Sequence, residues 1–87
     1  MIDRHLPTQA LDLLEVDRWE THGDPIETHR RVAAMWSAYL RHEVTPDQVA
    51  MCMVMVKIAR SASGYARDDY LDSIGYMIIA EGLARPC

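Results

Sequence analysis

The feature that most constrains the fold is the run from Val49 to Val56, in which every residue is apolar. The segment Thr45-Pro46-Asp47 precedes this run and is typical of a helix start, with Thr45 as the cap and Pro46 in the first turn. At helical spacing, an all-apolar run leaves no side of the helix for water and must pack against several neighbours. The helix predicted over residues 46–61 therefore belongs in the interior of the structure.

Three further helices are predicted around this one. The second opens at Asp24-Pro25-Ile26-Glu27, which offers a capping aspartate, a proline at the first helical position and a glutamate three residues after the cap. Asp68 or Asp69 is predicted to cap the last helix, which Pro86 prevents from continuing. No period-two strand pattern appears, so we predict an all-α single domain over residues 1–87. Its four helices are expected at about 8–21, 25–41, 46–61 and 68–84.

The second helix is predicted to be amphipathic. Its inward histidine, His29, has two interpretations: a hydrogen-bonded core residue, which is the commoner case, or a ligand-binding residue. Arg30, Arg31 and Arg41 fall on the opposite, solvated side. Seven residues are predicted to share the inner side: Ile26, His29, Val32, Ala33, Trp36, Tyr39 and Leu40.

Four short helices from a chain of 87 residues can scarcely surround the apolar run. We therefore predict that the third and fourth helices form a central antiparallel hairpin. This hairpin is expected to pack in a homodimeric or larger bundle.

Charge and composition restrict the class of protein. A net charge of −4 disfavours a duplex nucleic-acid binder, which normally carries a clustered basic face. Cys52 and Cys87 form no disulfide framework or zinc-ligand pattern, which suits a reducing cytosol. Met1 to His5 lack the apolar stretch of an export signal, and the Val49–Val56 run is too short to cross a bilayer. We expect a cytoplasmic protein without a membrane partner.

A charged cluster lies where the third and fourth helices meet. Lys57 and Arg60 share a side near the end of the third helix, and acidic residues begin the fourth. In an antiparallel hairpin, these cations and carboxylates meet beside the connecting loop. One interpretation is a set of ion pairs that only fixes the hairpin. The other is a site in which Lys57 and Arg60 bind phosphate while the carboxylates of Asp68, Asp69 and Asp72 bind Mg²⁺.

The sequence resembles a family of small phage-encoded domains of unknown function over roughly residues 15–82. The segment from Lys57 to Tyr76 is more distantly similar to a nucleotide-modification-associated phage domain, and the helical layout to MazG-type nucleotide pyrophosphohydrolases. The resemblance to the small phage domains depends on six stretches: His22–Pro25, His29, Trp36–Leu40, Thr45–Ala50, Val56–Arg60 and Asp68–Tyr76.

This resemblance implies a viral or prophage origin, and it implies that Asp24, His29 and Tyr76 join Lys57 and Arg60 as ligand-binding residues. MazG-type catalysis uses two acidic pairs on facing helices, whereas this chain offers one convincing pair, so enzymatic activity stays open.

The first functional hypothesis is a phage accessory protein that recognises a nucleotide or similar phosphorylated molecule and is at most a minimal phosphohydrolase. The alternative is a non-enzymatic protein that binds a host factor during infection. The resemblance also implies that the signature positions of the family correspond in this sequence to Asp24, His29, Lys57, Arg60, Asp68, Asp72, Gly75 and Tyr76.

Overall fold

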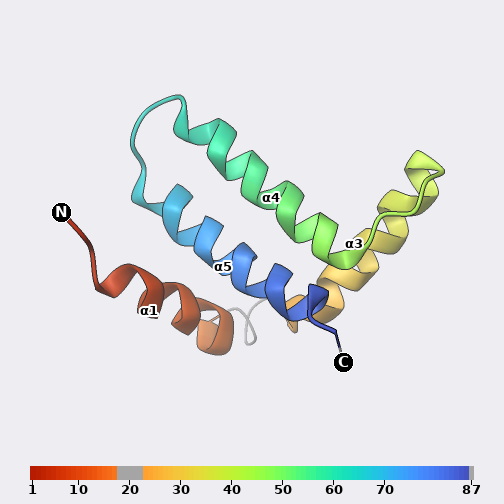
Figure 1. Ribbon diagram of the computed structural model, residues 1–87, viewed down its shortest axis with the longest axis horizontal. Helices are drawn as coiled ribbons and strands as arrows, with labels where there is room; N and C mark the ends of the chain where they lie inside the picture. Colours follow the sequence, from red (N-terminus) through yellow and green to blue (C-terminus); the bar gives the residue numbers. More distant parts are fainter. Residues whose placement is uncertain (18–22, 87) are drawn as a thin grey trace.

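The computed structural model describes residues 1–17 and 23–86, and all regular structure in this part of the chain is helical (Figure 1). This confirms the predicted all-α fold. Residues 18–22 and 87 lie outside the described part, and with them the predicted end of the first helix and His22. The segments are α1 (His5–Asp12), a short π-helical segment η1 (Leu13–Asp17), α3 (Pro25–Leu40), α4 (Pro46–Ser61) and α5 (Arg67–Ala84).

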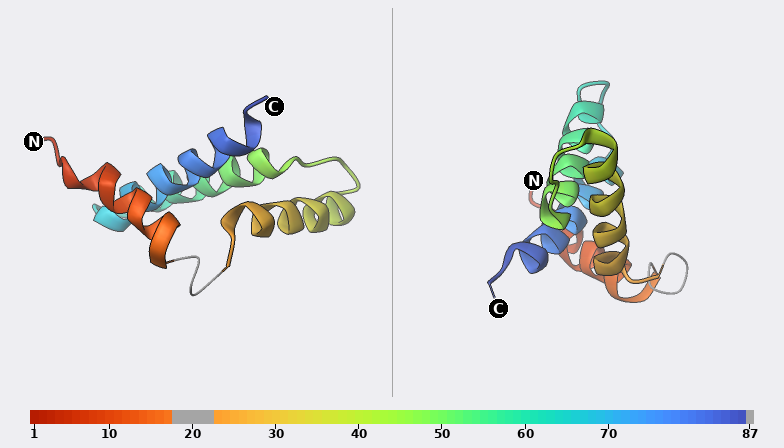
Figure 2. Two further views of the ribbon diagram at one scale, coloured as in Figure 1. Left: turned by 90° about the horizontal axis from the view of Figure 1, so that it is seen from below. Right: turned by 90° about the vertical axis from the view of Figure 1, so that its right-hand side faces the viewer.

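Helices α4 and α5 run antiparallel, side by side, and share the most extensive packing in the fold (Figure 1). The predicted central hairpin is therefore confirmed. Figure 2 shows that α3 covers one side of this hairpin and that α1 lies along α5. The opposite side of the hairpin carries no helix of the described chain.

Local hydrogen bonds explain where α3 and α4 begin. Asp24 is the cap of α3, and its Oδ1 accepts a hydrogen bond from the Ile26 N–H at 2.9 Å. At the start of α4, the Thr45 N–H donates to Oε1 of Gln48 at 2.9 Å, the backward half of a capping box. Each cap is followed by a proline at the first helical position, where a missing N–H costs no hydrogen bond. Both predicted starts are confirmed.

Two predicted helix starts are wrong. The first helix begins at His5 rather than at residue 8, because Asp3 Oδ1 accepts the His5 N–H at 2.9 Å. Pro7 then falls within the first turn, where proline is tolerated. The last helix is not capped by Asp68 or Asp69: its cap position is Ala66, in an extended conformation, and both aspartates lie in the first helical turn. Carboxylates there still interact favourably with the helix dipole.

The buried core is small. Leu14, Ala50, Ile79 and Ala80 form its centre, and Ile26, Tyr76 and Leu83 pack around them. Among the described residues, no large side chain is completely buried. Within the all-apolar run, only Val49, Ala50 and Val54 are buried, whereas Met51, Met55 and Val56 are exposed. A single copy of the chain therefore leaves part of this run in solvent.

The outer end of α3 departs from the amphipathic prediction. Tyr39 and Leu40 were expected on the inner side, but both are exposed. The reason lies in the tertiary arrangement, because this end of α3 projects past the hairpin before the chain returns to α4 (Figure 1). His29 and Ala33, nearer the start of α3, are buried as predicted. None of the described helices has the length and apolar character that a membrane span requires.

Candidate functional site

The first pair of the predicted cluster is a close ion pair between the two hairpin helices. Lys57 Nζ lies 3.0 Å from Asp72 Oδ2, and the side chains are only 13% and 21% exposed. Asp72 also lines a narrow cavity between α5 and the α1–η1 segment, together with Tyr76. This cavity has about 10 Å³ of free volume, which is room for one water molecule at most. A nucleotide does not fit at this pair.

The second pair is more open. Arg60 Nε lies 3.8 Å from Asp69 Oδ1, but the Arg60 side chain is 64% exposed whereas Asp69 is buried, with its side chain 8% exposed. Within the described chain, the Arg60 guanidinium makes no hydrogen bond, and its ion-pair partner is Asp69. One edge of the guanidinium therefore stays available to an external anion.

Arg60 and Asp69 line an open groove of about 350 Å³ beside the loop that joins α4 to α5. We call this hollow the loop groove; its other lining residues are Ser63, Gly64, Tyr65 and Ala66. Gly64 has φ +135°, a conformation that side-chain-bearing residues rarely adopt, so glycine fixes the path of the loop here. Ala66 supplies no side-chain acceptor to the N–H groups at the start of α5.

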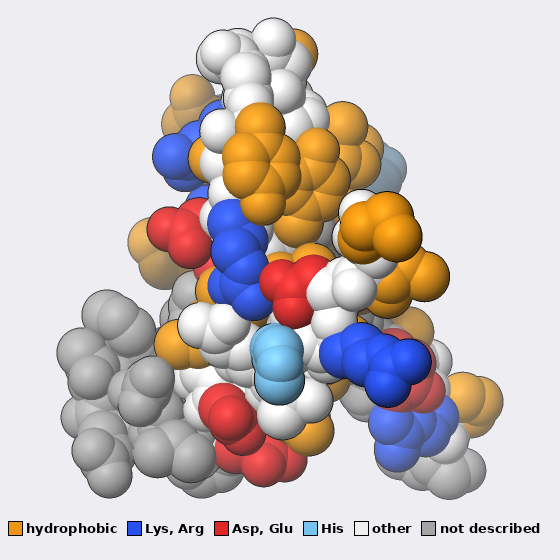
Figure 3. All heavy atoms as spheres, turned by 90° about the vertical axis from the view of Figure 1, so that its left-hand side faces the viewer, with side chains coloured by type: hydrophobic (Ala, Val, Ile, Leu, Met, Phe, Trp, Pro, Cys, Tyr) orange, Lys and Arg blue, Asp and Glu red, His pale blue; other side chains and the backbone are white. Residues whose placement is uncertain are grey.

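The aromatic wall of the loop groove is Tyr65. Its side chain is largely exposed, and its ring stacks on that of Tyr70 with 5.8 Å between ring centroids and 28° between ring planes. Figure 3 views the molecule from the end that carries the loop and the start of α1. Hydrophobic side chains gather there beside basic and acidic ones, and neither sign of charge dominates the face.

The three aspartates predicted to bind Mg²⁺ do not converge. Asp68 is exposed, Asp69 contacts Arg60, and Asp72 contacts Lys57. Asp69 and Asp72 are three residues apart and share a side of α5, but each carboxylate contacts a different cation of α4. In residues 1–17 and 23–86, no group of three or more His, Cys, Asp or Glu side chains is placed to hold a metal ion.

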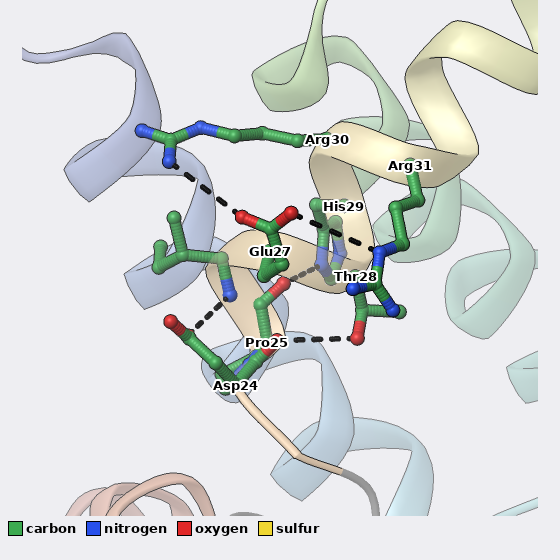
Figure 4. Close-up of polar contacts among 8 residues, drawn as sticks. Asp24, Pro25, Glu27, Thr28, His29, Arg30 and Arg31 are labelled. Carbon is green, nitrogen blue, oxygen red and sulfur yellow. Dashed lines mark hydrogen bonds and ion pairs between the residues drawn. The ribbon is translucent and has the colours of Figure 1, made fainter.

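Asp24 and His29 lie at the start of α3, outside the loop groove (Figure 4). His29 is buried, and its Nδ1 lies 2.7 Å from the Pro25 carbonyl oxygen, which assigns the Nδ1–H as donor. Its ring meets the edge of Tyr76 on α5, with centroids 6.0 Å apart. The contact between His29 and Tyr76 helps to dock α3 on the hairpin, whereas Asp24 caps the start of α3. Figure 4 also shows Glu27 turned towards Arg30 and Arg31 rather than back to its own cap.

The predicted site residues thus occupy three places. Arg60 and Asp69 meet at the loop groove, Lys57 and Asp72 form a closed pair near Tyr76, and Asp24 and His29 hold the start of α3. Sequence reasoning gave no role to the loop between the third and fourth helices, so it did not single out Ser63, Gly64 and Tyr65. A glycine followed by an aromatic residue between two charged helix ends is the signal that could have found them.

Comparison with known proteins identifies the family. Residues 6–84 match the model of a domain of unknown function, DUF6378. The chain is 38% identical over 81 residues to the Gene 55 protein of Mycobacterium phage L5, covering 91% of this chain and 52% of that protein. It is 36% identical over 69 residues to the Gene 55 protein of Mycobacterium phage D29, covering 78% of this chain and 46% of that protein.

The chain therefore spans about half the length of the curated relatives it matches. No solved structure matches it. These matches confirm the resemblance to small phage domains of unknown function and give no support to a MazG-type similarity. The chain belongs to the DUF6378 family, and its relatives in that family include phage proteins.

Proposed function

We propose that this phage protein binds a nucleotide or a similar phosphorylated small molecule in the loop groove. The observation that carries the proposal is the Arg60 guanidinium, which lines the groove, is 64% exposed and makes no hydrogen bond within the described chain. The volume of about 350 Å³ lies at the lower end of the range typical of small-molecule sites.

Arg60 suits a phosphate group for a geometric reason. A guanidinium can donate two parallel hydrogen bonds to phosphate oxygens, and it keeps its charge throughout the physiological pH range. Asp69 lies 3.8 Å from Nε, too far for a hydrogen bond, so it can orient the side chain while the exposed guanidinium keeps its hydrogen-bond donors for the ligand. The first N–H groups of α5 border the same groove and add a positive helix end.

Tyr65 suits the base of a nucleotide. Tyr65 lines the groove, and its ring stacks on that of Tyr70. Stacking of a base on an aromatic side chain contributes about 1–3 kcal/mol, and it tolerates different bases. A ligand with both a phosphate and an aromatic ring therefore fits better than inorganic phosphate alone. We expect the protein to act in the host cytoplasm, where such molecules occur.

We assign Lys57 and Asp72 to the hairpin rather than to the ligand, because they contact each other away from the groove. Among the described residues, no three His, Cys, Asp or Glu side chains are placed to hold a metal ion together. A hydrolytic role would therefore need Mg²⁺ that arrives bound to the nucleotide. Binding without hydrolysis is therefore the simpler proposal.

A thermal-shift panel of nucleotides and cyclic nucleotides, with and without Mg²⁺, tests this function. At a ligand concentration 100 times the dissociation constant, binding adds about 2.7 kcal/mol to the free energy of unfolding. Arg60→Gln should abolish the shift, whereas Arg30→Gln, which removes an exposed arginine of α3, should keep it. A panel in which no compound raises the melting temperature contradicts the proposal, and so does an Arg60→Gln variant that responds like the wild type.

The second candidate function is the binding of a host protein without catalysis. Two observations favour it: the Lys57–Asp72 pair is closed, and Met35 and Tyr39 expose apolar surface one turn apart on α3. Affinity capture from host lysate should then recover one protein with the wild type but not with Met35→Ser/Tyr39→Ser. Equal capture by both forms contradicts this alternative.

A further inference from the structure

The side of the hairpin opposite α3 carries no helix of the described chain (Figure 2), and apolar side chains are exposed on it. Two shallow hollows cross this side. One, of about 210 Å³, includes Met51 and Met77, and the other, of about 440 Å³, includes Ile74, Met77 and Ile78. Because Met77 lines both, the apolar surface is continuous from α4 to α5. We call it the outer hairpin face, formed by Met51, Met55, Ile58, Ile74, Met77 and Ile78.

The exposed area of the chain is larger than that of a typical folded monomer. The accessible surface is 6540 Å² for a mass of 9.9 kDa. The usual scaling with mass gives about 5,200 Å² for a monomer of this size. The excess, about 1,300 Å², exceeds the roughly 800 Å² that each partner buries in a stable interface of standard size. The radius of gyration of 13.8 Å likewise exceeds the value of about 12 Å expected for 87 residues.

The pattern of residues on α4 also matches a helix–helix contact. Met51, Met55, Ile58 and Ala62 are spaced by four, three and four residues, which is the spacing of a coiled-coil seam. The charged residues that line the hollows, Asp47 and Glu81, lie together at one end of the hairpin. Glu81 is already paired with Arg85. The rest of the face therefore carries apolar contacts and no charge that needs a complementary partner.

We propose that the outer hairpin face is the contact surface of a homodimer. Two copies pack their hairpins face to face about a two-fold axis, so that α4 and α5 of each copy form a four-helix bundle. A second copy fits this face because it brings the same uncharged apolar surface, and the excess exposed area of the whole chain is larger than what each copy buries in a stable dimer. The proposal concerns the side of the hairpin away from α3 and is independent of the ligand in the loop groove.

Analytical ultracentrifugation tests the dimer. The wild type should sediment at twice the 9.9 kDa mass of the chain. Met55→Glu and Met77→Glu each place an unpaired charge in the apolar contact surface of both copies, and each should weaken dimerisation by about 100-fold or more. The matched control, Met35→Glu, changes an exposed methionine of α3 and should leave the dimer intact. A monomeric wild type overturns the proposal, as does a dimer that survives both face variants.

A second measurement uses the wild type and does not depend on whether a variant folds. In a dilution series followed by NMR of methyl-labelled methionines, the signals of Met51, Met55 and Met77 should shift as the dimer dissociates. The Met35 signal should not move. A dilution series in which only Met35 responds places the interface on α3 and refutes the assignment.

Discussion

Replacing Lys57 with methionine should lower the stability of the protein strongly. Methionine keeps much of the apolar stem but removes the cation that lies 3.0 Å from the Asp72 carboxylate, whose side chain is only 21% exposed. Breaking a fully buried pair costs about 3–5 kcal/mol, and an exposed pair contributes about 0.2–1 kcal/mol. The low exposure of both side chains places this loss near the lower end of the first range, at about 3 kcal/mol.

The expected change in melting temperature follows from the size of the chain. Unfolding entropy of about 2.1 cal/mol/K per residue gives about 0.18 kcal/mol/K for 87 residues. A loss of about 3 kcal/mol therefore lowers the melting temperature by about 16 °C. Circular dichroism at one fixed protein concentration measures this change, since self-association makes the melting temperature depend on concentration.

Arg30→Met is the control for Lys57→Met. The Arg30 side chain is 62% exposed and lies 4.0 Å from Glu27, so its removal should cost no more than about 0.5 kcal/mol. Combining Lys57→Met with Asp72→Asn should cost less than the sum of the single changes, because the two groups interact. The reasoning is refuted if Lys57→Met melts within about 3 °C of the wild type, or if the two substitutions are additive.

Three further predictions concern helix ends and the N-terminus. Asp24→Ala should destabilise the protein by about 1 kcal/mol in urea titrations, whereas Asp24→Asn should keep the cap and change stability little. Arg41 follows α3 at φ 54°, so Arg41→Gly should raise stability by about 1 kcal/mol in the same assay. The hydrogen bond from Arg67 lowers the pKa of Asp3, so this contact stabilises the fold above the ordinary aspartate pKa and is lost as pH falls through the lowered pKa. NMR titration of the Asp3 carboxyl should show the lowered pKa in the wild type and a return towards the ordinary range in Arg67→Gln.

The elements that the sequence predicted well are those whose ends are encoded locally. Asp24 and Thr45, each followed by a proline, define the starts of α3 and α4 without help from tertiary contacts. The start of α1 depends on the side chain of Asp3, and the cap of α5 falls on Ala66, a residue without a capping group. Tyr39 is exposed because its end of α3 extends past the hairpin. The periodicity of apolar residues along one helix does not reveal how far that helix extends past its neighbours.

The candidate site was predictable only as a set of pairs. The hairpin brings Lys57 close to Asp72 and Arg60 close to Asp69. This pairing is expected because the end of one helix and the start of the next lie side by side in an antiparallel hairpin, and here they carry opposite charges. Which pair stays open depends on the loop, because Gly64 and Tyr65 leave a hollow beside Arg60 while the α1–η1 segment narrows the space beside Asp72. That difference comes from packing between distant segments and not from spacing along the chain.

The hairpin packs apolar residues such as Ala50 and Ile79 between its helices, carries ion pairs towards its loop end, and leaves further apolar surface exposed on its outer side. A closed pair such as Lys57–Asp72 contributes little net stability compared with an apolar contact, but it fixes the register of one helix against the other. The register in turn decides whether Met51 and Met77 lie beside each other on the outer hairpin face. If this account is correct, Lys57→Met lowers the affinity of the dimer although Lys57 lies outside that face. Sedimentation of the folded variant at increasing protein concentration measures that coupling, and an unchanged dimer affinity would separate the ion pair from assembly.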